Sequence, residues 1–419
     1  MTVTPEKHHD KYSAFRHVSY QRYFMSRFLS AFAIQILSVA VAWQIYDETQ
    51  SALLLGLIGL VQFLPALLLV VVTGIASDKL GRRMVMGAAI LTQMVCAVGI
   101  FYLAVAQRFN PVWVLSILTL FGVARAFYSP AAVSLAVNLV PREDFANAAG
   151  WNTSAWQLAT IVGPAAGGLL YGLSGPFAYG VSVVIFLLSA LLIFSIPKPQ
   201  QVIQQDESNL DMILGGFRYI WKQKIVLGAI SLDLFAVLLG GAVALLPIYA
   251  RDILELGPTG LGFLRAAPGI GAIATVFYLS AFPIKDHAGK ILFFSVAMFG
   301  AMTAIFGASK LAWLSIIALI GVGAFDMISV YIREIILQLW TPDHVRGRVN
   351  AVNSIFLGAS NELGEFRAGM MAAVYGAVFT VVGGGAAAIG VSVLWARIFP
   401  SLRNTRSLDD DLVEADRSD

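Results

Sequence analysis

The sequence predicts an all-helical integral membrane protein, with twelve transmembrane helices in two pseudo-symmetric halves of six helices each. Of the 419 residues, 58% are hydrophobic and only 13% are charged, whereas soluble domains carry about 25% charged residues. The apolar residues fall into twelve runs, each near or above the roughly 20 residues that a helix needs to cross a bilayer. Basic residues gather in alternate connections between these runs. This composition places the chain in lipid.

The twelve runs are taken in chain order. The first six predict helices over 24–46, 52–76, 84–106, 112–139, 148–172 and 177–196. The last six predict helices over 225–250, 258–283, 290–309, 312–339, 349–376 and 378–399. The expected divisions are therefore an N-terminal segment 1–23, a first half 24–196, a linker 197–224, a second half 225–399 and a tail 400–419.

The connections predict the orientation of the spans. Most of their Lys and Arg residues lie on one side, and only Arg108, Arg251 and Lys310 lie on the other. Because basic connections remain in the cytoplasm, both termini are expected there. The first twenty residues are polar and basic and lack an apolar core, so we expect no cleaved signal peptide.

The linker 197–224 begins with Pro-Lys-Pro and continues with Gln, Asp, Glu and Ser, which is typical of a flexible connection. Apolar residues at helical spacing from Leu210 to Trp221 predict a short helix in the membrane interface. The alternative is a cytoplasmic extension of the seventh span. An offset of 201 residues relates Pro141 to Pro342 and Asn152 to Asn353, which predicts a parallel repeat of the two halves.

Charged residues inside the predicted spans are the main functional clue. The candidates are Arg125, Asp233, Arg265, Asp326, Arg333, Glu362, Glu365 and Arg367. Each costs roughly 2.5–3.5 kcal/mol at a helix centre, so these side chains should line a cavity or pair with one another. The alternative is that they form fixed salt bridges that only hold helices together.

Four acidic residues are the candidates for proton coupling: Asp326, Asp233, Glu362 and Glu365. Asp326 is related to Arg125 by the same offset of 201 residues, and both lie about thirteen residues into their spans, near the bilayer midplane. Glu362 and Glu365 share one helix face. Two neighbouring carboxylates do not both ionise readily, which suits proton binding. Alternatively, Arg367 or Arg125 neutralises them permanently.

Polar and aromatic residues in the first, fourth and fifth spans predict a roomy amphipathic cavity. The candidates for its lining are Arg125, Gln35, Tyr128, Asn152, Trp156 and Gln157. Aromatic residues in membrane helices also face lipid or pack against other helices, so that interpretation stays open.

The segment from Gly74 to Arg83 has the pattern G-x-x-x-D-K-x-G-R-R. It resembles the signature loop between the second and third spans of the major facilitator superfamily. The resemblance implies that Asp78 and Arg82 form a cytoplasmic gate, in a loop completed by Gly74, Gly81 and Arg83. The matching loop of the second half, 284–290, lacks the glycine and the double arginine.

The fifth span contains Gly163, Pro164, Gly167 and Gly168, a pattern similar to the antiporter motif of that superfamily. Ala159 replaces the first glycine of the motif. Three further stretches, 42–51, 125–131 and 338–365, resemble the drug and siderophore exporter branch. That resemblance covers nearly the whole chain. In the superfamily the first, fourth, seventh and tenth spans line the cavity, so Arg125 and Asp326 would face each other there, with Asp233 beside them.

The resemblance implies proton-coupled efflux of an organic amphiphile such as a siderophore or drug, by alternating access. An uptake permease or a uniporter of a small solute remains the alternative. We expect a monomer in a bacterial inner membrane, with lipid, H⁺ and a small organic substrate as partners and no nucleic acid. With Cys96 as the one cysteine, we expect no metal or other cofactor.

Two other classes are disfavoured. Gly172-Leu173-Ser174-Gly175 matches a G-x-S-G pattern of intramembrane serine proteases, but all five histidines fall in termini or loops. No phosphate-binding G-x-x-x-x-G-K-[ST] sequence occurs, so the energy for transport should come from an ion gradient. A receptor without transport would need a larger domain outside the membrane than these connections can form.

Overall fold

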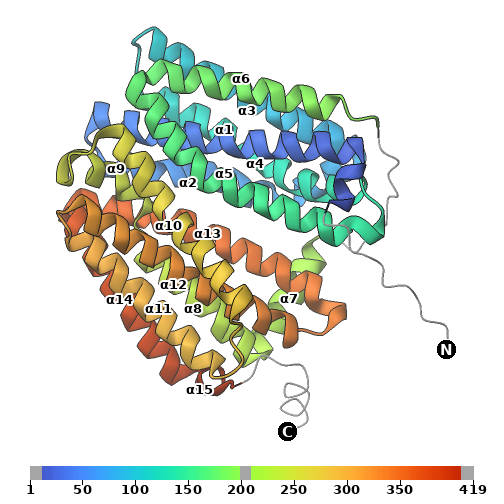
Figure 1. The fold of residues 1–419 in the computed structure, drawn as a ribbon, viewed down its shortest axis with the longest axis vertical. Helices are drawn as coiled ribbons and strands as arrows, with labels where there is room; N and C mark the ends of the chain where they lie inside the picture. The colour runs from blue at the N-terminus through green and yellow to red at the C-terminus, as the bar shows by residue number, and fades with distance from the viewer. Residues whose placement is uncertain (1–11, 199–208, 407–419) are drawn as a thin grey trace.

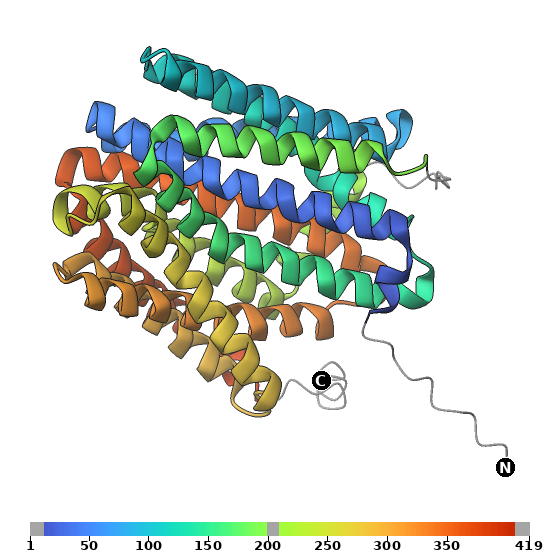
Figure 2. The same ribbon diagram turned by 45° about the horizontal axis from the view of Figure 1, so that its top comes forward.

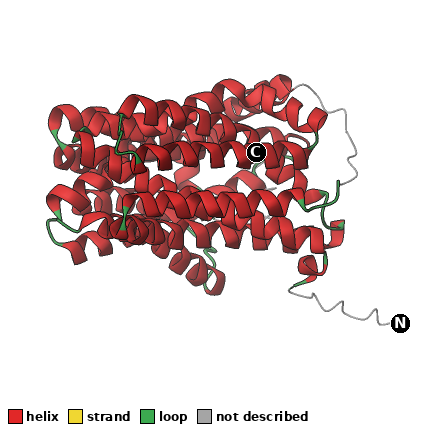
Figure 3. Ribbon diagram, turned by 90° about the horizontal axis from the view of Figure 1, so that it is seen from above, coloured by secondary structure: helices red, strands yellow, loops and turns green. Residues whose placement is uncertain are grey.

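The computed structural model describes residues 12–198 and 209–406, and within these ranges every regular element is a helix (Figures 1 and 3). The first long helices are α1 (Val18–Thr49), α2 (Ala52–Leu80), α3 (Arg82–Val105), α4 (Pro111–Val137), α5 (Phe145–Leu173) and α6 (Gly175–Phe194). The later ones are α8 (Lys224–Gly240), α10 (Gly257–Ala281), α11 (Ala288–Ala308), α12 (Ala312–Leu339), α13 (Asp343–Tyr375) and α14 (Ala377–Ile398). The shorter elements are η1 (Ser13–Arg16), η2 (Arg142–Asp144), α7 (Asn209–Lys222), η3 (Val243–Leu245), α9 (Leu246–Ile248), η4 (Tyr249–Ile253) and α15 (Pro400–Asn404).

Within the described ranges, ten helical stretches are long and apolar enough to cross a membrane. The predicted runs 148–172 and 349–376 form the helices α5 and α13, which are not among these ten. The sequence explains the difference, because α5 carries Asn, Gln, Ser and Thr, and α13 carries charged residues. Both helices pack between other helices, α5 between α1 and α10 and α13 between α2 and α8. Because their neighbours are other helices and not lipid, α5 and α13 need less apolar side-chain surface than helices that face lipid.

Short connections and local capping define the helix ends. Gln50 adopts a left-handed conformation at the end of α1, and the Ser51 hydroxyl accepts a hydrogen bond from the Leu54 N–H at the start of α2. The Asn110 side chain accepts from the N–H groups at the start of α4. These residues satisfy terminal backbone groups that have no helical partner. The tight turns make α1 and α2 antiparallel neighbours.

The helices α1–α6 pack mainly on one another, as do α8 and α10–α14 (Figures 1 and 2). Two main contacts join these groups, α5 with α10 and α2 with α13. Glycines form both: a Cβ atom on Gly168 would lie 2.9 Å from the Cα of Gly262, and one on Gly369 would lie 2.6 Å from the Cα of Gly56. Only residues without a side chain let backbones approach so closely in a membrane.

The predicted span 225–250 is interrupted. The helix α8 ends at Gly240, and after Gly241 the chain continues through η3, α9 and η4, the last of which is a π-helix. Glycine lowers helix stability, and π-helical turns often occur at functional sites. The irregular segment ends with Arg251 and Asp252 at its exposed end.

The predicted interfacial helix forms as α7, although residues 199–208 of the linker lie outside the described part, as do 1–11 and 407–419 of the predicted terminal segments. Extended Gln223 separates α7 from α8, so α7 is not a continuous extension of the next span. Trp221 is 75% exposed, whereas Ile220 is buried. An apolar side chain exposed beside basic residues suits the surface of a bilayer.

Candidate functional site

Charged side chains meet where α2, α4, α10 and α13 approach one another. The Nη1 atom of Arg125 lies 3.8 Å from Oε1 of Glu362 and donates to Oε1 of Gln62 at 3.4 Å. The side chain of Arg125 is 45% exposed and that of Glu362 is 21% exposed. This ion pair therefore lies at the edge of an accessible space, between α4 of the first group and α13 of the second.

Both glutamates of α13 lie over one glycine of α2. A Cβ atom on Gly59 would stand 2.9 Å from Oε2 of Glu362 and 3.2 Å from Oε2 of Glu365. Arg265 of α10 interacts electrostatically with both carboxylates and donates from Nη1 to the Ser38 hydroxyl at 2.7 Å. We call Arg125, Arg265, Glu362 and Glu365 the central cluster. Its two guanidinium groups balance its two carboxylates.

A second cluster lies between α8 and α12. Asp233 and Arg333 form an ion pair, and only 2% of the Arg333 side chain is exposed. Asp326 interacts electrostatically with both residues and lies two helical turns before Arg333 on α12. We call these three residues the α8–α12 cluster. It contains two carboxylates but one guanidinium, so it carries a net negative charge when both acids are ionised.

Arg125 and Asp326, which the family resemblance would set facing each other across a cavity, belong to different clusters. Among the described residues Arg125 pairs with Glu362, while Asp326 lies with Asp233, as expected, and with Arg333. Arg367 does not neutralise the glutamates, because its guanidinium donates to the Leu239 carbonyl near the end of α8 at 2.7 Å. Arg265, which the sequence marked only as a charge inside a span, is the second cation beside them.

The predicted cavity residues differ in their burial. Asn152 is buried and accepts a hydrogen bond from the Tyr20 hydroxyl, and Gln35 packs against Gly163 where α1 meets α5. Trp156 is 51% exposed, and Gln157 is half-buried. Tyr128 is half-buried between α1 and α4 and lies near Tyr23 and Arg27. Asn152 is thus enclosed, whereas Gln35, Tyr128, Trp156 and Gln157 keep accessible surface, as does Arg125.

The glycine-rich pattern of α5 makes close helix contacts on two sides. A Cβ atom on Gly167 would lie 2.9 Å from the Cα of Ile36 on α1, while Gly168 faces Gly262 on α10. Pro164 is inside α5, and its carbonyl lies against Gly262. The pattern therefore places α5 between α1 and α10, a packing role that does not depend on any bound solute.

The turn between α2 and α3 contains Gly81, whose φ of +94° favours glycine. Arg82 donates to the Ser134 carbonyl and to Oδ1 of Asn138, both at 3.1 Å, and Arg83 donates to the Ile196 carbonyl. These arginines bind carbonyl groups at the ends of α4 and α6, where a cation is favoured. The side chain of Asp78 lies outside the described residues, as does the environment of Gly74.

A network that the sequence analysis did not identify joins the end of α1 to η4. Nε of Arg251 lies 2.9 Å from Oδ1 of Asp47, and the Tyr46 hydroxyl donates to Asp252. The Arg251 guanidinium also lies 5.9 Å from the centre of the Tyr46 ring. We call these four residues the α1–η4 lock. In the sequence, Arg251 was one of three basic residues in the connections on the side opposite most Lys and Arg residues. No sequence pattern indicated its partner Asp47.

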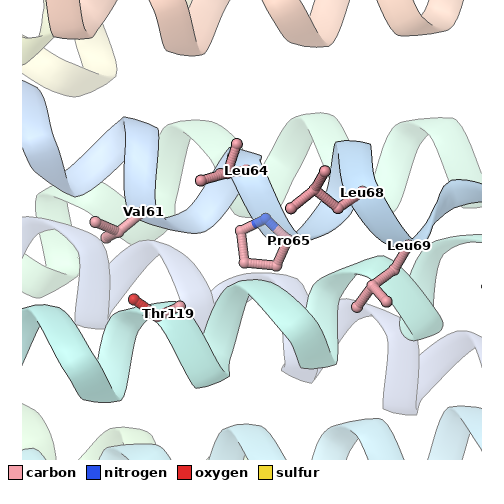
Figure 4. Close-up of a pocket in the computed structure, with 6 residues that line it drawn as sticks. All are labelled: Val61, Leu64, Pro65, Leu68, Leu69 and Thr119. Carbon is pink, nitrogen blue, oxygen red and sulfur yellow. The ribbon is translucent and has the colours of Figure 1, made fainter.

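A shallow pocket of about 360 Å³ lies between α2 and α4 (Figure 4). Its lining consists of Val61, Leu64, Pro65, Leu68, Leu69 and Thr119. Thr119 bonds to its own helix, at the Leu115 carbonyl. This pocket offers no free polar group to a solute and suits a lipid chain better than a polar substrate.

Comparison with known proteins decides the family. A family model described as "Transmembrane secretion effector" matches residues 9–415. The chain belongs to this family of the major facilitator superfamily. It is therefore a multi-pass membrane transport protein and not an enzyme. The family match confirms the resemblance found in the sequence.

Two relatives match almost end to end. The enterobactin exporter EntS of Shigella boydii serotype 4 (strain Sb227) is 24% identical over 407 residues, covering 96% of each chain. The EntS protein of Escherichia coli O9:H4 (strain HS) matches with the same identity and coverage. Two enterobactin exporters therefore align with nearly all of this chain.

Solved transporter structures share the fold. A bacterial homologue of the human lysosomal transporter Spinster, in an inward-facing, occupied conformation, matches with a TM-score of 0.70 at 12% identity, over 94% of this chain and 96% of that one. The nucleoside transporter NupG matches with a TM-score of 0.64 at 15% identity, over 92% and 99%. At these identities the likeness concerns the fold alone.

Proposed function

We propose that this protein is a proton-coupled exporter of a small organic amphiphile, such as a siderophore or drug. It would work as a monomer in a bacterial inner membrane with both termini in the cytoplasm. In this proposal α5 and α13 also cross the membrane, which completes twelve spans in two halves, 24–196 and 225–399. The polar surfaces of these two helices would face other helices and the transport path.

The α8–α12 cluster carries the proposal. Two carboxylates share one buried guanidinium, so one acid has no cation of its own. A proton on Asp326 would make the cluster neutral, whereas loss of that proton leaves a net negative charge in a low-dielectric interior. Because a buried charge is costly, the two protonation states should favour different conformations. That difference is what couples a proton gradient to transport.

Alternating access requires contacts that form and break at each end of the path. The α1–η4 lock joins the two helix groups at the end of α1, which the distribution of basic residues places outside the cell. At the opposite end, the turn with Gly81, Arg82 and Arg83 is a gate by family resemblance, with Asp78 as its acidic residue. The central cluster lies between these two regions and joins four helices of both groups.

The direction of transport rests on the relatives. Exporters of enterobactin align with 96% of this chain, which supports efflux more than uptake. The accessible aromatic and polar residues, with Trp156 as the most exposed, suit an amphiphile with an aromatic part. The charged clusters provide the ion coupling that a uniporter would not need.

Two experiments test the proposal. Mass spectrometry of the culture medium would compare cells without the protein, cells with the wild type and cells with Asp326→Asn. We expect one compound to accumulate outside only with the wild type. Purified protein in liposomes should then release protons from the lumen when that compound and a pH gradient are applied. Depletion of a medium component, with no exported compound, would instead indicate an uptake permease.

A further inference from the structure

Arg27 differs in its surroundings from the arginines of the two charged clusters and from Arg367. Arg125, Arg265 and Arg333 each lie beside a carboxylate, and Arg367 binds a carbonyl near the end of α8. Arg27 lies nine residues into α1, about 14 Å along its axis. Within the described part of the chain its side chain has no carboxylate partner, and its ionisable neighbours are tyrosines, which are neutral at pH 7.

Among the residues that the structure describes, the Arg27 side chain makes one hydrogen bond, which leaves most of its donors unused. Nη1 donates to the Tyr23 hydroxyl at 2.9 Å, and that hydroxyl in turn donates to the Ala132 carbonyl at 2.8 Å. A guanidinium has five N–H groups in a planar fork, so four remain for another acceptor. Tyr128 of α4 is close enough to interact electrostatically with the guanidinium. Arg27 itself is half-buried, so a ligand can reach it.

The helix geometry places Arg27 on the face of α1 that contacts the second group further along the helix. Ser38, which binds Arg265 of α10, lies eleven residues further along α1. Eleven residues make about three turns, so both residues share one face of α1. At the level of Ser38 that face meets the second group. At the level of Arg27 the neighbours described by the contacts above, Tyr23, Ala132 and Tyr128, all belong to the first group.

We infer that Arg27, with Tyr23 and Tyr128, is an anion-binding subsite on the path to the central cluster, and that the transported molecule is an organic anion. A carboxylate or phenolate oxygen would accept the unused N–H groups of Arg27. Such charge-assisted bonds are roughly twice as strong as neutral ones, and arginine suits planar oxyanions. The tyrosine rings would pack against an aromatic part of the ligand. This inference rests on the proposed transport function and specifies its substrate class.

The test measures binding of matched acid and amide probes to the full-length protein. Radiolabelled 1-naphthoate and 1-naphthamide have the same ring, and only the first is an anion at neutral pH. In phosphatidylcholine nanodiscs we expect the wild type to bind the acid about tenfold more tightly than the amide. Arg27→Gln should lose this preference, and Arg27→Lys should keep most of it. Arg22→Gln, which removes a charge five residues earlier in α1, should keep all of it.

Equal affinities in the wild type, including no binding of either probe, would overturn the inference, as would a preference that survives Arg27→Gln. Should Arg27→Gln fail to fold, Arg27→His replaces it and should prefer the acid only below a pH of about 6.5. Nanodiscs with phosphatidylglycerol provide the lipid control. If the preference disappears there while Arg27→Gln binds both probes as it does in phosphatidylcholine, an anionic lipid headgroup occupies Arg27, and the solute subsite is contradicted.

The result is separable from the proposed export. A preference for the acid without proton-driven flux would support the anion subsite and contradict the export mechanism. Proton-driven export by a protein that binds the acid and the amide equally would support the export mechanism and contradict the anion subsite.

Discussion

Asp326 and Asp233, on different helices, stand beside the same guanidinium, that of Arg333. Asp233 forms the ion pair, and Asp326 is the acid without a cation of its own. The two aspartates therefore differ in what their removal should do, although both are candidates for proton coupling.

Asp326→Asn should remove proton coupling while leaving the protein folded. The change leaves Asp233 paired with Arg333, so we expect a loss of stability of no more than about 1 kcal/mol. Proton-driven flux in liposomes should fall to background, while exchange of substrate without a gradient continues. Gradient-dependent flux equal to that of the wild type would contradict the role of Asp326.

Asp233→Asn should act mainly on stability. It leaves the guanidinium of Arg333 buried without its ion-pair partner, a loss that typically costs about 3–5 kcal/mol. Since Asp326 remains nearby, we expect the lower end of that range. Thermal unfolding of the two variants in detergent checks this order, and a smaller loss for Asp233→Asn than for Asp326→Asn would be evidence against it.

Gly59→Ala should disturb the central cluster without changing any charge. The added methyl group would lie 2.9 Å from a carboxylate oxygen of Glu362, so the side chains must move, at a cost of about 1–3 kcal/mol. We expect slower transport and a lower melting temperature. Gly383→Ala on α14 is the matched control, because no atom lies within 4 Å of its added methyl group. Equal effects at both glycines would rule out the proposed collision.

Arg251→Gln should open the α1–η4 lock. It removes the ion pair with Asp47, and the reversed pair Asp47→Arg with Arg251→Asp should restore it. Spin labels at exposed Glu48 and Glu255, in a Cys96→Ser background, would report the distance between the two groups. We expect a longer-distance population in Arg251→Gln that the reversed pair suppresses. Arg108→Gln is the control, and an unchanged distance in Arg251→Gln would show that the lock does not hold the groups together.

The junction of α1 and α5 should depend on pH. Nε2 of His17 lies 3.0 Å from Oδ2 of Asp144. Hydrogen bonds from Ser13 and His17 lower the pKa of Asp144 below its usual value of 3.8. A lowered pKa means that the acid stabilises the fold fully above about pH 4 and that this contribution is lost as the pH falls through the lowered pKa.

Asp144→Asn should remove that contribution at every pH. We therefore expect faster cleavage by trypsin after Arg16 in the variant at pH 7, measured against Glu143→Gln in the same turn. Identical cleavage rates in the two variants would show that the His17–Asp144 contact does not stabilise the junction.

The helices could largely be predicted from the sequence, because apolar length and basic connections follow directly from the bilayer. The helices α5 and α13 were predicted as spans, but they are not among the ten helices that are apolar enough to cross a membrane. The reason is that neighbouring helices replace lipid around them. The break after Gly240 was missed, since the apolar run continues across it unchanged.

The charged residues of the spans could be identified from the sequence, but their partners could not. Pairing depends on how helices from distant parts of the chain meet. The sequence therefore left Arg125 and Arg367 as alternative cations for the glutamates, and the structure places Arg125 beside Glu362. Arg27 was within the first predicted span, yet it was not singled out. A check of every charge within 24–46 would have found it, although its lack of a carboxylate partner is visible only in three dimensions.

The glycine contacts between the two helix groups also affect how the groups can move. Gly168 faces Gly262, and Gly56 faces Gly369, so smooth backbone lies on smooth backbone at both places. If side chains interlocked at these contacts, they would have to separate before one helix could move across the other. They would then have to repack in each new position. Glycine backbones have no side chains that interlock in this way. The two contacts can therefore act as pivots, about which the two helix groups tilt relative to each other while their backbones stay in contact.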